Sequence, residues 1–282
     1  MKHAFLILTH NEFDVLAKLV AALDHEKNDI FIHYDEKVKD ISSLCTEFSK
    51  CIILKNRLNG RWGDYSLVEI EFELLKCAVQ ESSYDFFHII SGVHYPLKPM
   101  NKIHSIYELG NKCMFYPLPT NEEEINHKMR RYHFCNRMMM SYAFGSVGYK
   151  LWRLLWNCVL KIQKVLNIQR NKGFIFYKSS QWCTLTKEAV DYILTKEHEV
   201  RKRYSHTFCP DEYFVLSELM NSPLKDQIMF KGNLLKQDWV STHPKVYKQE
   251  NFYELIASGC LFARKFSSES IELLNRIDNY IQ

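Results

Sequence analysis

The sequence lacks any arrangement of cysteines that would indicate a disulfide framework or a zinc site. Nine cysteines are present, an odd number, and no two of them form a Cys-x-x-Cys pair. Irregular spacing of this kind is typical of thiols in a reducing compartment. The chain also lacks a run of about 18 uncharged apolar residues, the length that a membrane span needs. The apolar residues 4–8 are too few for a signal peptide and read as a strand, so we expect a cytoplasmic protein.

Several motifs of nucleotide and metal chemistry are also missing. The chain has no P-loop, no Gly-x-Gly-x-x-Gly, no His-Glu-x-x-His and no Asp-x-Asp pair. Asp-x-Asp commonly holds a divalent cation on a bound diphosphate. Without it, a diphosphate would need Lys or Arg side chains to stabilise its charge. The net charge of +4 is mild and does not indicate a nucleic-acid partner.

The first part of the chain predicts alternating strands and helices. The apolar run over residues 4–9 is typical of a strand covered on both faces, and residues 29–34 form a second one. Helical spacing from Glu12 to Leu23 lies between them, so a parallel βαβ unit is expected. We therefore predict an α/β fold, with the whole chain, 1–282, as one domain. Further strands are expected at 51–55, 85–91, 113–116 and near 228–230.

Polar residues follow the first two predicted strands. Thr9, His10 and Asn11 come after the first, and Asp35 comes after the second. Ligands of open parallel sheets gather where the carboxyl ends of the strands meet. We therefore expect these side chains around one crevice.

The segment 208–214 carries two adjacent carboxylates. Asp211 and Glu212 follow Pro210 and precede apolar residues at helical spacing, so a helix should begin at Pro210. Proline and acids both suit a helix start, and the local sequence favours that structural role. The alternative is that one carboxylate lies at the edge of a cleft and removes a proton from a hydroxyl. Upstream, residues 174–185 predict a strand, a polar loop and a second strand.

Residues 149–170 predict an amphipathic basic helix. Its apolar stripe comprises Leu151, Leu154, Leu155, Cys158, Val159, Ile162, Val165 and Leu166. Lys150, Arg153, Lys161 and Lys164 lie off this stripe. One interpretation is a helix that packs on the core with a solvated basic face. The other is a surface that rests on an anionic membrane or on a lipid-linked acceptor.

Two adjacent cations occur near the end of the chain. Arg264 and Lys265 are bracketed by Phe262 and Phe266, so at least one of them can be held in place. They could stabilise a diphosphate, with Lys245 as a weaker further candidate. Solvated surface cations are the alternative.

Six stretches of the chain follow one another in a specific order, although no single stretch is specific by itself. They are AFLILTHN with FIHYDEK, RWGDYSLVE, FFHIISGVHYPLK, SSQWCTLT, CPDEYF and LFARKF. Through these stretches the chain resembles the core-2/I-branching β-1,6-N-acetylglucosaminyltransferases and the peptide O-xylosyltransferases over nearly its whole length.

The resemblance implies a GT-A type fold with a Rossmann-like central sheet flanked by helices, a UDP-sugar donor, inversion and no metal. It places the general base on Glu212 and the diphosphate-binding pair on Arg264 and Lys265. A further family arginine falls on Thr242, His243 or Lys245. Asp211, next to the base, is assigned to capping or a structural hydrogen bond.

The resemblance also implies where the remainder of the substrates bind. Uridine would contact Asp35 and either Trp62 or Tyr65, next to Thr9 and His10. Acceptor contacts would come from Trp239 and from the 120–140 region, which contains Arg130 and Arg131. Residues 1–119 would then be the nucleotide-sugar half, and 120–282 the acceptor-binding and catalytic half.

We therefore expect a metal-independent inverting glycosyltransferase that moves a sugar, GlcNAc in preference to xylose, from UDP to a saccharide hydroxyl. A sugar hydroxyl needs a base at neutral pH, and inversion needs only one. The alternatives are a UDP-xylose-dependent xylosyltransferase and a binding module without activity. Peripheral contact with the inner face of the cell membrane is expected through residues 149–170.

Overall fold

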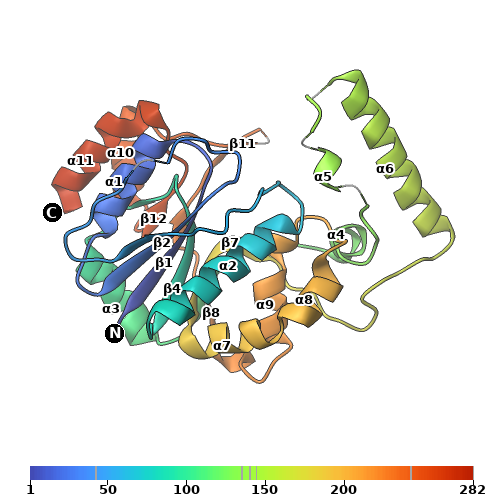
Figure 1. Ribbon diagram of the computed structural model, residues 1–282, viewed down its shortest axis with the longest axis horizontal. Coiled ribbons are helices and arrows are strands. Elements are labelled where there is room, and N and C mark those ends of the chain that lie inside the picture. Colours follow the sequence, from blue (N-terminus) through green and yellow to red (C-terminus); the bar gives the residue numbers. More distant parts are fainter. Residues whose placement is uncertain (42, 135, 140, 144, 242, 282) are drawn as a thin grey trace.

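A computed structural model describes residues 1–41, 43–134, 136–139, 141–143, 145–241 and 243–281 (Figure 1). A seven-stranded sheet lies at its centre, with strand order β3-β2-β1-β4-β7-β6-β8. All neighbours pair in parallel except β7, which is antiparallel to β4 and to β6. The strands are β1 His3–Thr9, β2 Asn28–Tyr34, β3 Cys51–Ile53, β4 Phe86–Ser91, β6 Cys113–Pro117, β7 Ser179–Thr186 and β8 Ile228–Phe230. The predicted α/β class is confirmed.

Helices cover both faces of the sheet (Figure 1). One layer consists of α1 Phe13–Leu23, α3 Met100–Gly110, α10 Phe252–Ala257 and α11 Ile271–Ile281. The other consists of α2 Ser66–Glu81, α7 Lys187–Thr195, α8 Glu197–Tyr204 and α9 Phe214–Met220. Short 3₁₀ helices occur at η1 Pro210–Glu212, η2 Lys225–Gln227, η3 Gln249–Asn251 and η4 Ser268–Ser270.

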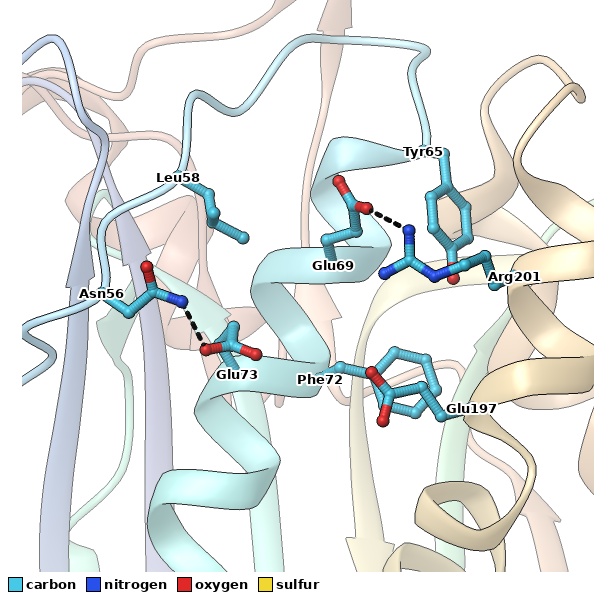
Figure 2. Close-up of a pocket in the computed structure, with 8 residues that line it drawn as sticks. All are labelled: Asn56, Leu58, Tyr65, Glu69, Phe72, Glu73, Glu197 and Arg201. Atoms are coloured by element: carbon cyan, nitrogen blue, oxygen red, sulfur yellow. Dashed lines mark hydrogen bonds and ion pairs between the residues drawn. The ribbon is translucent and has the colours of Figure 1, made fainter.

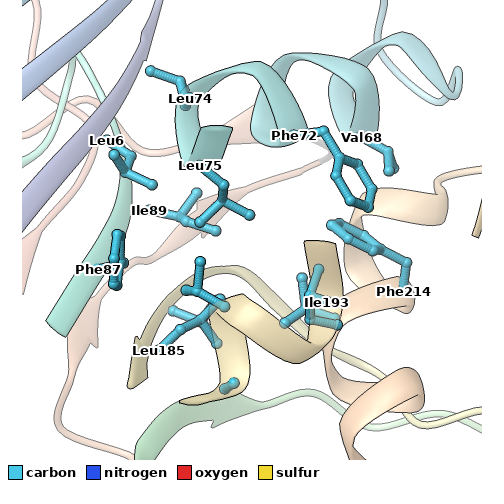
Figure 3. Close-up of a cluster of buried hydrophobic side chains, with 14 of the residues drawn as sticks. Leu6, Val68, Phe72, Leu74, Leu75, Phe87, Ile89, Leu185, Ile193 and Phe214 are labelled. Atoms are coloured by element: carbon cyan, nitrogen blue, oxygen red, sulfur yellow. The ribbon is translucent and has the colours of Figure 1, made fainter. Parts of the chain in front are cut away.

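Successive side chains of each strand point to opposite faces of the sheet, so each strand contributes to a hydrophobic core on either face. In β4, Phe86 and Ile90 face the layer that contains α1 and α11, whereas Phe87 and Ile89 face α2 and α7. Figure 3 shows the second of these cores, where Phe72 of α2 lies against Phe214 of α9. Burial on both faces explains why these strands appear in the sequence as uninterrupted apolar runs.

Two small sheets bring the C-terminal part of the chain back to the end of β4. β12 Phe262–Ala263 pairs with β5 Tyr95–Pro96 and with β9 Leu235–Lys236. β10 Trp239–Val240 pairs with β11 His243–Pro244 in a separate hairpin. As a result, residues 260–266 lie next to residues 93–97, far from them in sequence.

Two predictions of secondary structure are wrong. Residues 174–178 form no strand, and the polar Ser179, Ser180 and Gln181 belong to β7 instead of a loop. The predicted helix at Pro210 begins as η1, because Tyr213 has φ −125°, and α9 begins only at Phe214. Local polarity indicated a loop, but pairing with β6 and β4 decides the strand.

The segment after β6 forms α4 Glu122–Lys128, α5 Asn136–Met139 and α6 Val147–Val165. Figure 1 shows α6 at the edge of the molecule, beyond α4 and α5. The predicted helix exists, but its apolar stripe does not pack on the core: Leu151, Leu154 and Leu155 are exposed, whereas Trp152 is buried. The packed interpretation is therefore wrong. None of the helices in the described ranges is both long and apolar enough to cross a bilayer.

Candidate active site

The turn that carries the two carboxylates is fixed by backbone hydrogen bonds to two distant segments. The N–H of Phe208 donates to the carbonyl of Lys128, and the N–H of Cys209 donates to the carbonyl of Gly63, each at 3.0 Å. Cys209 has φ 51°, which turns the chain sharply before η1. Gly63 must be glycine here, because a Cβ would lie 2.7 Å from the Phe208 ring and the residue has φ +76°. The loop before α2 and the end of α4 thus position Glu212.

Glu212 faces a pair of lysines at the edge of the molecule. Its Oε2 lies 3.4 Å from Nζ of Lys128 and 3.6 Å from Nζ of Lys178, and its side chain is 32% exposed. Both lysines also bind Glu124, at 2.8 and 2.7 Å. The carboxylate of Glu212 is therefore oriented by two cations and still accessible to a substrate.

The pKa values of Glu124 and Lys128 are shifted by this arrangement. Burial alone would raise the pKa of Glu124, but its hydrogen bonds from Lys128 and Lys178 lower that pKa to about 2. Burial works in the opposite sense on Lys128, whose pKa is nevertheless raised by the neighbouring Cys209, Glu212 and Glu124. Lys128 therefore carries its charge beside Glu212 at neutral pH.

Asp211 lies beside Glu212 on η1 and is partly buried. Burial, followed by the charge of Glu212, raises the pKa of Asp211 to about 7. Its Oδ1 is buried and, within the described part of the chain, has no hydrogen-bond partner. The nearby Glu71 of α2 is fully buried, and burial raises its pKa well above the usual value. Gln181 of β7 donates to Glu71 at 2.7 Å. Cys209 occupies the N-cap position of η1 and makes no capping hydrogen bond with its side chain.

A second cationic cluster lies at the end of β12. The N–H groups of Arg264, Lys265 and Phe266 donate to the carbonyls of Lys236, Lys245 and Val93, at 3.0, 3.2 and 3.2 Å. The guanidinium of Arg264 lies 4.9 Å from the centre of the Trp182 ring. Burial lowers the pKa of Arg264 to about 10, and its Nε has no partner among the described residues. Arg264 is thus a half-buried cation whose Nε donor is still available.

The predicted crevice at the carboxyl ends of β1 and β2 lies beside this cluster. The N–H of Asp35 donates to the carbonyl of Thr9 at 2.8 Å, which joins the two strand ends. The pKa of His10 is lowered first by burial and then by Lys37, Lys265 and Arg264, against the effect of Asp35. Thr9 and Asp35 are therefore joined at the strand ends, and His10 lies close enough to Asp35, Arg264 and Lys265 to feel their charges.

Asp35 organises the loop above the crevice. Its Oδ2 accepts from the N–H of Gly60 at 2.9 Å, and its Oδ1 accepts from the N–H of Lys37 at 2.9 Å. A side chain at position 60 would have little room, since a Cβ on Gly60 would lie 3.2 Å from Oδ2 of Asp35. A carboxylate that fixes this loop still has free lone pairs for a ligand hydroxyl.

Trp62 and Tyr65, the two aromatic candidates just before α2, lie in different surroundings. Trp62 is exposed and packs edge-on against Phe208, near the turn that carries Glu212. Tyr65 is buried, with Arg201 5.6 Å from its ring centre, and lines a different cavity. The two candidates for the uridine contact therefore do not share one pocket.

The cavity that Tyr65 lines has the wrong charge for a diphosphate. It measures about 170 Å³ and lies between α2 and α8, with Glu69, Glu73 and Glu197 in its wall (Figure 2). Arg201 is the cation in the wall, and it pairs with Glu69 at 2.9 Å. An anionic ligand would meet more negative than positive charge there, so we do not assign the donor to it.

Four further residues were predicted to contact substrates: Lys245, Trp239, Arg130 and Arg131. Lys245 lies by its backbone next to Lys265, while its Nζ pairs with Glu254 at 3.3 Å. Trp239 is exposed in the β10–β11 hairpin of the same region. Arg130 pairs with Glu122 at 3.0 Å, and Nη1 of Arg131 is buried with no partner among the described residues.

Thr242, one candidate for the family's upstream arginine, lies outside the described residues. His243 is exposed at the start of β11.

Strand β7 connects the surroundings of Glu212 to the cationic cluster. Lys178, directly before the strand, contacts Glu212, Gln181 binds Glu71, and Trp182 stacks on Arg264. Four residues of extended chain span roughly 13 Å, enough for a sugar and part of a diphosphate between the two ends. Among the contacts of the described residues, none joins Glu212 directly to Arg264 or Lys265. The site is thus an elongated arrangement along β7.

Comparison with protein families decides the identity. Residues 3–257 match the family described as Core-2/I-Branching enzyme. The chain belongs to this family. Its members are glycosyltransferases, so the chain is a glycosyltransferase of the core-2/I-branching family, with a sugar donor and a saccharide acceptor. The predicted α/β fold with a central sheet flanked by helices is confirmed.

Solved structures add remote similarities. One is a glycosyltransferase involved in the glycosylation of the major capsid of PBCV-1, with 10% identity, 99% of this chain and 100% of that chain covered, and a TM-score of 0.41. Another is S. aureus TarS 1–349, with 10% identity, 79% and 67% coverage, and a TM-score of 0.28. Both TM-scores are too low to carry an argument about the site. No curated protein matches the chain.

Sequence reasoning missed the part of this branching-enzyme site that β7 builds. Lys128 and Lys178 flank Glu212, and Gln181 and Trp182 reach Glu71 and Arg264, but none of them was singled out as a site residue. Gln181 and Trp182 lie within SSQWCTLT, one of the six family stretches. Polar residues in a family stretch, next to an apolar half-strand, were the available signal.

Proposed function

We propose that the protein is a metal-independent inverting glycosyltransferase that transfers a sugar, GlcNAc in preference to xylose, from a UDP-sugar to a saccharide hydroxyl. Glu212 is the general base in this proposal. The observation that carries it is the environment of Glu212: a partly exposed carboxylate, oriented by two lysines, on a turn held from both sides. A base positioned in this way contributes about 10²–10⁴-fold to the rate of hydroxyl attack.

The leaving diphosphate is assigned to Arg264 and Lys265, with Lys245 nearby. Arg264 is half-buried and planar, and its Nε has no hydrogen-bond partner among the described residues, which suits an arginine that binds an oxyanion. Uridine would lie over the crevice of Thr9, His10 and Asp35. The proposed direction of transfer is therefore along β7, with the leaving group at Trp182 and the acceptor at Lys178.

The base is tested by replacing Glu212 with Gln. We expect kcat to fall by about 10²–10⁴-fold, while UDP binding measured by calorimetry stays unchanged. Glu122→Gln, an exposed acid on α4 that pairs with Arg130, is the matched control and should retain turnover. Retained turnover in Glu212→Gln would refute the assignment of the base.

Donor and metal are tested on the wild-type protein. A panel of UDP-sugars should give turnover with UDP-GlcNAc above UDP-xylose, and the reverse order would establish the xylosyltransferase alternative. Turnover with none of the donors would favour a binding module. EDTA should change the rate little, because cationic side chains take the place of a metal in the proposal. A strict requirement for Mn²⁺ would overturn that part.

A further inference from the structure

The outer face of α6 is apolar and open to solvent. Val147, Leu151, Leu154, Leu155, Ile162 and Val165 are each between 56% and 77% exposed. Their spacing places them on one side of a 19-residue helix, roughly 28 Å long. Contiguous exposed apolar area of this kind marks an interaction surface on a soluble fold.

The opposite face of α6 holds the helix to the protein. The Gln163 side chain accepts from the N–H of Tyr132 at 2.7 Å and donates to its carbonyl at 2.8 Å. The ring of Trp156 lies 5.5 to 5.7 Å from the rings of His133, His127 and Phe208. This inner face makes the contacts with the body, and the apolar side chains of the outer face stay exposed among the described residues.

Positive charge borders the outer face. Lys150, Arg153, Lys161 and Lys164 are all exposed, and the helix contains no acidic residue. At 100° per residue, Lys150 and Lys161 lie within about 40° of Leu154, at one edge of the apolar face. A second copy of the helix would bring like charges together, which disfavours self-association. An anionic lipid surface complements both the charge and the apolar face, and it requires no groove.

We propose that α6 is a docking surface for an anionic membrane, with its apolar face in the lipid interface and its lysines among the headgroups. Trp156 contacts Phe208, four residues before Glu212, so docking would place the acceptor end of the site close to the bilayer. Only this last step rests on the proposed function. The docking itself needs neither donor nor acceptor.

The docking is tested by co-sedimentation of the full chain with vesicles of phosphatidylcholine, with and without phosphatidylglycerol. We expect binding to the anionic vesicles that weakens with salt. Leu151→Ser combined with Leu155→Ser should lower the partition coefficient by about a hundredfold, since each buried leucine contributes about tenfold or more. Lys150→Gln with Lys161→Gln should lower it by about twentyfold, and only towards anionic vesicles.

Matched controls lie elsewhere on the surface. Leu109→Ser removes an apolar side chain that is 87% exposed on α3, and Lys102→Gln with Lys225→Gln removes two exposed cations. Neither control should change vesicle binding. Wild-type chain that binds no vesicles, or leucine and control variants that bind alike, would overturn the proposal. So would a wild-type dimer in light scattering that becomes monomeric only in the leucine variant, because α6 would then join two copies.

A second measurement does not depend on variants that disturb the apolar face. Cys158 is exposed on the same side of α6 as Leu151 and Leu154. A polarity-sensitive fluorophore on this thiol should shift to the blue when anionic vesicles are added. The shift should be missing in Cys158→Ser labelled in the same way. An unchanged spectrum in the wild-type chain would overturn the insertion of this face.

Discussion

Replacing Asp211 with Asn tests whether burial of the ionised carboxyl beside Glu212 lowers the free energy of unfolding. Burial raises the pKa of Asp211 from 3.8 to about 7. Between these values the native state binds more protons than the unfolded state, so the free energy of unfolding falls as the pH rises. A shift of this size corresponds to at most about 4 kcal/mol above pH 7. Asp211→Asn should therefore be more stable than wild type at pH 8, and by much less at pH 4.

Urea unfolding of both proteins from pH 4 to pH 8 measures this difference. Only the difference between variant and wild type is diagnostic, because other groups titrate in both proteins. Glu71→Gln should act in the same direction, since burial also raises the pKa of Glu71. The exposed Asp14→Asn is the control and should follow the wild-type curve. Parallel curves for Asp211→Asn and wild type would refute the reasoning.

Three further changes test the site and the strand ends. Lys178→Met should lower kcat by about tenfold with little effect on the donor KM, because Lys178 orients Glu212 and not the leaving group; an effect on donor KM alone would contradict this. Arg264→Gln should raise the donor KM by tenfold or more, with Arg264→Lys intermediate because it keeps the charge but loses the planar contact with the indole. Gly92→Ala should destabilise the protein by about 1–3 kcal/mol in urea unfolding, because its Cβ would lie 2.6 Å from Oγ1 of Thr9. If Gly92→Ala is as stable as wild type, the ends of β1 and β4 can move apart to make room for the added Cβ.

Much of the fold follows from local sequence. The strands at residues 4–9 and 29–34 were predictable because a strand buried on both faces leaves a continuous apolar run. Strand β7 was only half predictable, since its polar end is decided by pairing with β6 and not by its own residues. The break at Tyr213 had no local signal.

The candidate site shows the same division. The crevice of Thr9, His10 and Asp35 could be predicted, because strand ends converge by topology alone. The lysines around Glu212 could not, because Lys128 and Lys178 approach it from positions 84 and 34 residues away. For α6, the periodicity predicted the helix, but the sequence could not tell which of its faces contacts the protein.

The antiparallel strand β7 has a consequence for engineering. Because Lys178 directly precedes the strand that contains Trp182, the distance between the two ends of the site is set by four residues of backbone. In the proposed mechanism, altered acceptor choice should therefore come from exchanging residues between α4 and α6, outside β7. An insertion or deletion in β7 should instead change the distance between the proposed base and the proposed diphosphate site.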